Sequence, residues 1–150
     1  MDTTGFFRYP GAEIALADDT RGFLADRDAG DWTLLLEHTE TRLFRPGEVV
    51  LAAGEHDRAL YLLLDGRLQA PSGTIDAITT VGEAAFLDGR PRTVSLSAVT
   101  SGELARLGFE AYEALAARRP ELGRAVLLDL GRLLASRLHA TGDRTPGWTG

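Results

Sequence analysis

The sequence predicts a mainly β domain with flanking helices, and the distribution of turn residues is the first reason. Between residues 42 and 107, short extended runs are separated by turn-forming pairs such as Pro46 with Gly47 and Asp65 with Gly66. After Gly108 the apolar residues follow helical spacing instead. Strands this short and this evenly interrupted indicate a small sandwich, barrel or jelly roll rather than a parallel sheet.

The composition is that of an ordinary globular protein. The chain has 150 residues, of which 44% are hydrophobic and 25% are charged, enough for one domain with a buried core. No apolar run approaches the ~18 residues that cross a bilayer, and the N-terminus lacks a basic region followed by an apolar one. We therefore expect a cytoplasmic protein without a membrane segment. The absence of cysteine excludes disulfides, a thiolate nucleophile and zinc fingers.

The charge balance limits the possible partners. A net charge of −6 argues against a general duplex-binding surface, because contact with many phosphates needs a basic face. We therefore expect no direct DNA binding. A local pocket that contains arginine is compatible with this balance.

Residues 1–30 are predicted to be an N-terminal extension, because their apolar residues are too irregularly spaced for a helix. We expect this extension to pack on the outside of the core. Asp31 is predicted to cap a short helix over residues 32–38, in which Trp32, Leu35 and Leu36 follow helical spacing.

Alternation of apolar and polar residues is clearest over residues 93–99, which predicts a strand with one buried face. Two helices are predicted to follow, the first over residues 109–118. The second begins at Pro120, since proline is favoured at the first position of a helix, and ends near His139. Residues 141–150, rich in glycine, threonine and proline, are predicted to be a disordered tail.

The last predicted helix has an apolar arc wider than one packed surface needs. One stripe can cover the β-core while a neighbouring stripe meets a partner, which predicts a homodimer through residues 120–139. The first stripe contains Leu122, Val126, Leu130 and Leu133, and the second contains Leu127, Leu134 and Leu138.

Residues 81–95 have the features of an anion site. Gly82 precedes a short run of helical character, residues 83–87, which ends at the turn pair Asp88 and Gly89. Backbone N–H groups in the first turn of such a helix point out of its N-terminus, where the partial dipole is positive. The sequence therefore predicts that an anion binds at the start of this run.

The side chains around this turn fit a phosphate ligand. Ala84 and Ala85 are small enough for a ligand to reach the backbone, and Arg92 offers a planar fork of donors to the same anion. The hydroxyl of Thr93 adds a further donor. Glu83 would repel a phosphate, so we expect its carboxylate to face a different group, such as a sugar hydroxyl.

The order of these residues resembles a known family. A Gly-Glu pair, a short apolar run and a Pro-Arg-Thr triplet, here residues 82–93, resemble the phosphate-binding cassette of the cyclic nucleotide-binding domain family. This family includes catabolite activator protein, the regulatory subunits of cyclic-nucleotide-dependent kinases and cyclic-nucleotide-gated channels. The resemblance covers residues 31–140, and the segments similar to the family's opening strands are residues 44–50, 54–55 and 60–67.

The resemblance implies a role for each candidate residue after Gly82. It implies that Arg92 holds the cyclic phosphate and that Glu83 holds the ribose 2′-hydroxyl. The amides near Ala84 and Ala85 would bind the phosphate oxygens. Thr93, directly after the arginine, is similar to the hydroxyl that can meet the base in guanosine-responsive domains.

The resemblance also implies a fold and a function. The fold is a double-stranded β-helix, a jelly-roll-like β-roll, with an N-terminal helical segment and two C-terminal helices. The function is regulation rather than catalysis: cAMP or cGMP would bind inside the roll and reposition the helix over residues 120–139. No metal and no cofactor beyond this ligand is expected. We also expect a homodimer and a possible contact with a protein partner.

Three departures from the family pattern keep an alternative open. The segment between Gly66 and Gly82 is shorter than the family normally has, and residues 78–81 replace the usual Gly-Asp pair, with Val81 where an aromatic residue is common. The alternative is a degenerate domain of the same fold that binds no ligand and acts in dimerisation or protein interaction.

Enzyme classes find little support. His38, His56 and His139 are far apart in the sequence, which argues against the closely spaced histidines of a jelly-roll metal enzyme. No serine lies on a glycine-flanked strand-to-helix elbow. The glycines form neither a Walker loop nor a dinucleotide fingerprint.

Overall fold

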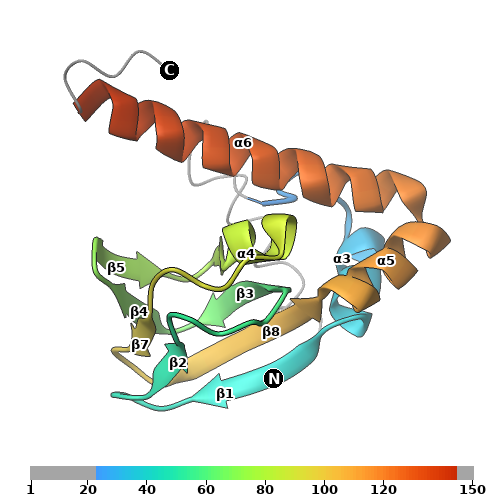
Figure 1. Ribbon diagram of the computed structural model, residues 1–150. Helices are drawn as coiled ribbons and strands as arrows, with labels where there is room; N and C mark the ends of the chain where they lie inside the picture. The colour runs from blue at the N-terminus through green and yellow to red at the C-terminus, as the bar shows by residue number, and fades with distance from the viewer. Residues whose placement is uncertain (1–22, 145–150) are drawn as a thin grey trace.

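Two antiparallel sheets form the body of the protein (Figure 1). The computed structural model describes residues 23–144, with side chains as far as His139. The eight strands in this part of the chain form two sheets of four, in the orders β1-β8-β3-β6 and β2-β7-β4-β5. Neighbouring strands are mostly not consecutive in sequence, so the chain passes repeatedly from one sheet to the other. The predicted mainly β fold with helices at both ends is confirmed.

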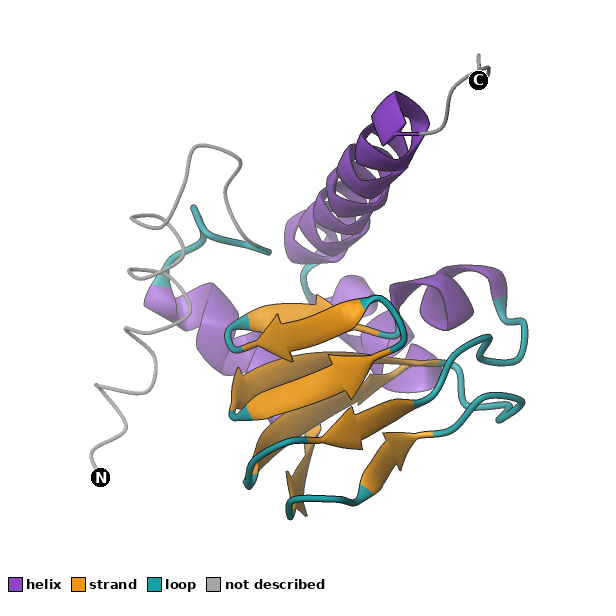
Figure 2. Ribbon diagram, turned by 90° about the vertical axis from the view of Figure 1, so that its left-hand side faces the viewer, coloured by secondary structure: helices purple, strands orange, loops and turns teal. Residues whose placement is uncertain are grey.

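The strands are short, as the spacing of the turns predicts. The first sheet contains β1 (Glu40–Phe44), β8 (Gly102–Gly108), β3 (Ala59–Asp65) and β6 (Thr79–Val81). The second sheet contains β2 (Val49–Leu51), β7 (Leu96–Ala98), β4 (Arg67–Ala70) and β5 (Gly73–Asp76). Figure 2 shows the strands of both sheets gathered into one body, with the helices outside it.

Strand β3 is buried on both faces because it lies between two hydrophobic clusters. Successive side chains of a strand point to opposite faces of the sheet. Leu60 and Leu62 belong to the cluster on the helix side, whereas Tyr61 and Leu63 belong to the cluster between the sheets. The first sheet therefore has helices on one face and the second sheet on the other.

The first described helix, α3 (Ala29–Glu37), is capped by Asp28, whose Oδ1 accepts the backbone N–H of Asp31 at 2.9 Å. The predicted cap at Asp31 is wrong, because a cap accepts from an N–H two or three residues later and Asp28 is the residue in that position. Asp31 instead lies in the first turn, where its Oδ1 accepts from Nη1 of Arg119 at 2.7 Å.

Two helices follow the last strand. Helix α5 (Phe109–Arg118) has the predicted bounds, and α6 (Pro120–Arg144) begins at the predicted proline. Helix α6 is longer than predicted, because it continues past His139, so that residues 141–144 of the expected tail are helical. The rest of the tail, and residues 1–22 of the expected N-terminal extension, lie outside the described residues.

The two predicted stripes of α6 are observed as different environments. The core stripe is buried, with Leu122, Val126 and Leu130 each 0% exposed. Two members of the second stripe, Leu127 and Leu138, are 42% and 52% exposed. The helix therefore covers the core with one face and leaves apolar surface on the other.

The predicted strand over residues 93–99 is correct only for residues 96–98, which form β7. Just before it, the backbone of Arg92 pairs with a loop: its N–H donates to the carbonyl of Glu55 at 2.9 Å, and its carbonyl accepts the N–H of Gly54 at 2.7 Å. Thr93 and Val94 are exposed and line a cavity. The alternating pattern therefore predicted a strand that is three residues too long at its start. The contacts of Arg92 with the loop keep residues 93–95 out of the sheet.

The segment before α3 enters the core, although the sequence placed it outside. Leu24 is 0% exposed, its N–H donates to Oδ2 of Asp129 at 2.8 Å, and its carbonyl accepts Nε1–H of Trp32 at 3.2 Å. Leu24 has a φ of 53°, in the left-handed region, which costs roughly 1–2 kcal/mol for a residue with a Cβ. The buried contacts with α3 and α6 compensate this cost.

We predict that Asp129→Ala lowers the free energy of unfolding by about 1–3 kcal/mol, because the buried N–H of Leu24 loses its acceptor. Urea denaturation measures this difference. Asp76→Ala is the control: Asp76 forms an exposed ion pair with Arg67, and such pairs contribute about 0–1 kcal/mol. Equal effects of the two substitutions would contradict the anchoring role of Asp129.

Candidate functional site

Helix α4 (Glu83–Asp88) has six residues and is bounded by glycines. Gly82 and Gly89 have φ values of 78° and 71°, which glycine adopts at little cost, so this short helix forms where the sequence predicts it. Phe86 is 0% exposed and packs against Phe109 with the ring centres 5.4 Å apart. Figure 1 shows α4 between the sheets and α6.

A cavity of about 250 Å³ lies beside α4. Its walls come from α4, from the loop that precedes β7 and from β2 and β7 themselves, so segments far apart in the sequence meet here. Leu51, Val94 and Leu96 add apolar surface to the wall. All of the residues predicted for the ligand site line this cavity: Gly82, Glu83, Ala84, Ala85, Arg92 and Thr93.

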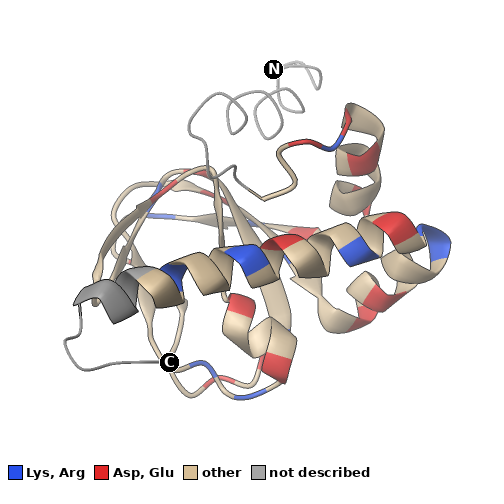
Figure 3. Cartoon of the chain, turned by 90° about the horizontal axis from the view of Figure 1, so that it is seen from above, with Lys and Arg blue, Asp and Glu red and all other residues tan. Residues whose placement is uncertain are grey.

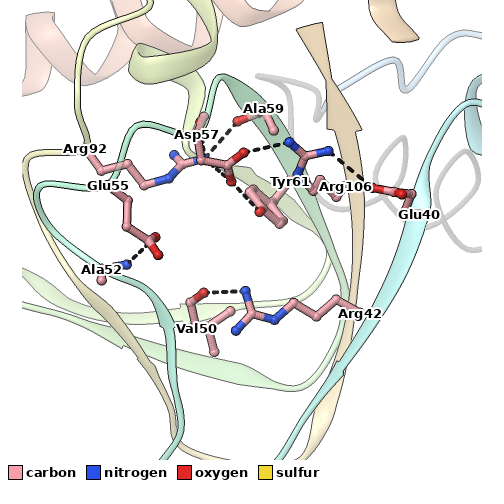
Figure 4. Close-up of polar contacts among 10 residues, drawn as sticks. All are labelled: Glu40, Arg42, Val50, Ala52, Glu55, Asp57, Ala59, Tyr61, Arg92 and Arg106. Atoms are coloured by element: carbon pink, nitrogen blue, oxygen red, sulfur yellow. Dashed lines mark hydrogen bonds and ion pairs between the residues drawn. The ribbon is translucent and has the colours of Figure 1, made fainter. Parts of the chain in front are cut away.

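Arg92 is buried in the cavity wall, with 6% of its surface exposed. Its Nη2 donates to the carbonyl oxygens of Asp57 at 2.9 Å and Ala59 at 3.2 Å, and lies 3.3 Å from the Asp57 carboxylate (Figure 4). Its Nε is buried and has no hydrogen-bond partner among the described residues. An unpaired buried donor costs about 1–3 kcal/mol, so this atom favours an acceptor supplied by a ligand.

The turn that starts α4 is shaped around the same guanidinium group. A Cβ on Gly82 would lie 2.5 Å from Nη1 of Arg92, closer than two such atoms can approach. The φ of 78° at this position also disfavours any residue with a side chain. The backbone conformation therefore favours glycine here, and a side chain at this position would also have to displace the end of Arg92.

Asp57 divides its carboxylate between the arginine of the site and a second arginine. Its Oδ1 accepts from Nη2 of Arg106 at 2.7 Å, and its Oδ2 accepts the hydroxyl of Tyr61 at 2.6 Å and faces Arg92. Burial raises the pKa of Asp57, but the hydrogen bonds from Arg106 and Tyr61 outweigh burial and hold the pKa below its usual value of 3.8. Arg106 also contacts Glu40 at 3.2 Å (Figure 4).

The hydroxyl of Tyr61 stays protonated in this network. Burial, and the hydrogen bond to Asp57, raise the pKa of Tyr61 above its usual value of 10.0. The same hydrogen bond from Arg106 to Asp57 raises the pKa of Arg106. At neutral pH the ionised carboxylate of Asp57 therefore accepts from the protonated hydroxyl of Tyr61 and from Arg106.

Glu83 is buried at the other end of the cavity wall and is tied to α6. Its Oε2 accepts the hydroxyl of Thr80 at 2.5 Å, and its Oε1 accepts from Nη1 of Arg137 at 3.1 Å. Both oxygens are therefore satisfied, as a buried carboxylate requires. Figure 3 shows α6 running across the roll with α4 beside it. The candidate site is thus in direct contact with the C-terminal helix.

Sequence reasoning missed several residues of this site, namely Asp57, Tyr61, Arg106 and Arg137. Asp57 meets Arg106 across 49 positions of sequence, and Glu83 meets Arg137 across 54. The one available signal was the position of Asp57, a charged residue in the loop that leads directly into the apolar run of β3. For Arg137, no local pattern distinguishes it from other exposed arginines of a long helix.

Two structural features bear on other classes of function. Among residues 23–144, no group of three or more histidine, aspartate or glutamate side chains is placed so that it could hold a metal ion. In the same part of the chain, no helix has the length and apolarity that crossing a membrane requires.

Comparison with known families and proteins identifies the relatives of this chain. Residues 41–119 match the family described as cyclic nucleotide-binding domain. The cAMP-dependent protein kinase regulatory subunit of Hypocrea atroviridis is 32% identical over 81 residues, which are 51% of this chain and 18% of that protein. Lysophospholipase NTE1 of Phaeosphaeria nodorum is 28% identical over 123 residues, which are 73% of this chain and 8% of that protein. The chain thus spans less than a fifth of the length of these curated relatives.

Solved structures share the architecture. A cyclic nucleotide-binding domain of Methylobacillus flagellatus KT has a TM-score of 0.76 and 24% identity, with 97% of this chain and 86% of that chain covered. Catabolite activator protein of Thermus thermophilus has a TM-score of 0.67 and 29% identity, with 77% of this chain and 57% of that chain covered. The predicted β-roll is confirmed by these likenesses.

The lowered pKa of Asp57 predicts how stability depends on pH. Its folded-state pKa lies below 3.8 while the unfolded chain titrates near that value, so the carboxylate stabilises the folded protein above about pH 3.8. This stabilisation is lost as the pH falls through the folded-state pKa. We therefore expect the wild type to be more stable than Asp57→Asn at neutral pH, and the difference to shrink below pH 3.8.

Urea denaturation at a series of pH values between neutrality and strong acid measures this difference. Asp65→Asn is the control, because Asp65 is an exposed carboxylate at the end of β3. A difference between wild type and Asp57→Asn that stays constant down to the acid end of the series would contradict the ionised network.

Proposed function

This chain belongs to the cyclic nucleotide-binding domain family, and we propose that it is a regulatory domain that binds cAMP or cGMP in the cavity beside α4. The observation that carries the proposal is Arg92, a buried guanidinium in the cavity wall whose Nε has no partner among the described residues. A phosphate oxygen is the acceptor that such a group prefers. The role is regulation by a bound messenger, not catalysis.

The charge of the network suits a single phosphodiester. The guanidinium groups of Arg92 and Arg106 share the carboxylate of Asp57, and the remaining acidic neighbour, Glu40, has a side chain that is 78% exposed. Solvent screens an exposed charge much more than a buried one. Arg92, Arg106 and Asp57 together therefore carry one net positive charge, which suits the one negative charge of a cyclic phosphate, while the buried carboxylate of Glu83 is paired with Arg137.

The proposed pose follows the family resemblance. The phosphate lies between Arg92 and the first turn of α4, where the N–H groups of Ala84 and Ala85 have no carbonyl of the same helix to bind. The hydroxyl of Thr93 supplies a further donor from the cavity wall. The ribose 2′-hydroxyl binds Glu83, and the apolar part of the wall accommodates the base.

Binding is coupled to α6 through Glu83. In the proposed pose the ribose hydroxyl donates to the carboxylate of Glu83, whose Oε1 accepts from Arg137 at 3.1 Å. A ligand that takes this oxygen weakens the contact between α4 and α6 and shifts the population of α6 positions. Repositioning of α6 is therefore the proposed output of the domain.

The first test is binding itself. Isothermal titration of the wild type with cAMP and with cGMP should give micromolar or tighter binding of at least one nucleotide. Arg92→Ala removes the group that pairs with the phosphate, and deletion of one partner of a buried charge pair costs about 2–5 kcal/mol. We therefore expect this variant to show no measurable binding.

Arg67→Ala is the matched control, because Arg67 forms an exposed ion pair with Asp76 and does not line the cavity. It should bind nucleotide as the wild type does. Absence of heat from both nucleotides with the wild type would refute the proposed function.

The second test concerns α6. None of residues 134–139 is buried, and the Arg137 contact with Glu83 joins this part of the helix to α4. We expect Arg137→Gln to increase amide hydrogen exchange in residues 131–139, and nucleotide to change exchange in the same segment of the wild type. Arg132→Gln is the control, because Arg132 pairs with Asp129 on the same helix. Unchanged exchange in Arg137→Gln would remove the proposed route to α6.

A second candidate function is the degenerate domain: the same fold without a nucleotide, used for dimerisation or protein interaction. Two observations favour it. Both oxygens of Glu83 already have partners within the chain, and Leu127, Leu128 and Leu138 are 42%, 50% and 52% exposed along α6. This candidate predicts no heat in the titration and a stable oligomer in sedimentation. A homodimer through residues 120–139 is compatible with both candidates, and a monomer that binds no nucleotide contradicts both.

A further inference from the structure

Helix α4 depends on the rest of the chain, because a helix of six residues is not stable by itself. At its C-terminal end the support comes from Arg58. The Nε of Arg58 donates to the carbonyl of Phe86 at 2.8 Å, and its Nη2 donates to the carbonyl of Leu87 at 2.9 Å. The last carbonyls of a helix lack N–H partners in the helix, so Arg58 satisfies groups that α4 cannot satisfy alone.

Arg58 also joins α4 to the start of α5. Its guanidinium carbon lies 3.6 Å from the ring centre of Phe109, the first residue of α5, in a cation–π contact. Its carbonyl accepts the backbone N–H of Phe109 at 2.9 Å. The ring of Phe109 in turn packs on Phe86 of α4. One residue therefore contacts the last turn of α4 and the first turn of α5 at once.

The neighbour of Arg58 in sequence holds the other part of the site. Asp57 accepts from Arg92 through its backbone carbonyl and faces it with its carboxylate. Asp57 and Arg58 directly precede β3, which is buried on both faces. This pair of residues thus connects the arginine, the short helix and the core strand.

We propose that Arg58 is a positioning residue of the ligand site, which fixes α4 relative to Arg92 and makes α4 and α5 move as one unit. This inference rests on the proposed function for its effect on nucleotide binding, but its structural part does not require a ligand. Arg58 does not line the cavity, so it acts on a ligand only through α4. Movement of α4 on binding is carried by Arg58 to α5 and from there to α6.

Arginine is needed at this position because two carbonyls and one aromatic ring must be contacted together. The planar guanidinium offers two parallel donors and a flat face, whereas the ammonium of lysine is a point charge on a flexible stem. Arg58→Lys therefore keeps the charge and loses the geometry. Arg58→Met keeps the length of the apolar stem and loses both the charge and the planar geometry.

The test compares Arg58→Met and Arg58→Lys with the wild type, and Arg67→Met serves as the matched control from an exposed ion pair. Hydrogen exchange of residues 83–89 is measured without ligand, and titration with cAMP and cGMP measures affinity. Thermal unfolding of each variant separates a local effect on α4 from a general loss of stability. Phe109→Leu tests the same cation–π contact from its other partner, since leucine keeps the apolar packing and removes the ring under the guanidinium.

We expect faster exchange at residues 83–89 in both Arg58 variants and in Phe109→Leu. We also expect nucleotide affinity to fall about tenfold or more, by analogy with the loss seen when a group that orients a metal ligand is removed. The Arg67→Met control should match the wild type in both measurements. A purely structural role would lower the unfolding temperature without lowering the affinity of the folded fraction.

The outcomes separate this inference from the proposed function. Exchange at residues 83–89 that equals the wild type in Arg58→Met overturns the positioning role, whatever the titration gives. Faster exchange with unchanged affinity overturns the link to the ligand. If the wild type binds neither nucleotide, the proposed function fails, while the exchange data still decide whether Arg58 holds α4. Wild-type behaviour of Arg58→Lys in both measurements overturns the requirement for a guanidinium.

Discussion

The buried guanidinium of Arg92 is the constraint on which the candidate site depends. Transfer of a charged group from water into a protein interior costs several kcal/mol, so the fold must surround this group with acceptors. Two backbone carbonyls just before and at the start of β3 and the carboxylate of Asp57 serve this purpose. Their positions are fixed because β3 is an inner strand of its sheet and is buried on both faces. The position of Arg92, a loop residue, thus depends on the buried strand β3.

The same guanidinium lies beside the residue that precedes α4, and this links the two halves of the candidate site. A Cβ on Gly82 would displace Nη1 of Arg92, which lies beside it. The N-terminal end of α4 therefore lies directly against the guanidinium group of Arg92. Arg58 fixes the opposite end of α4 by binding its last carbonyls. A short helix that would not persist in isolation becomes a defined part of the wall through restraint at both ends.

The sequence was sufficient for the features that local chemistry decides. The turns at Gly82 and Gly89, the short helix between them and the start of α6 at Pro120 were predicted, because glycine and proline restrict the backbone directly. The strand over residues 93–99 was too long, because pairing of Arg92 with the loop at Glu55 is tertiary. Asp57, Arg58 and Arg137 were missed for the same reason: each acquires its role from partners that lie about 30 or more positions away. The roles of all six predicted site residues toward a ligand remain predictions, namely those of Gly82, Glu83, Ala84, Ala85, Arg92 and Thr93.

The attachment of α6 fits the proposed function, in which a small ligand shifts the position of a long helix. Its first half is held by Leu122, Val126 and Leu130 in the core, whereas residues 134–139 are not buried and meet the site through Arg137. The side chain of Arg137 is 52% exposed and that of Glu83 is 6% exposed, so this ion pair is intermediate between an exposed pair and a buried one. A nucleotide that competes for Glu83 needs only a difference of about 1 kcal/mol in affinity between two positions of the helix to change their populations severalfold. Because the first half is anchored in the core, the proposed shift would change the direction of the second half without unfolding the domain.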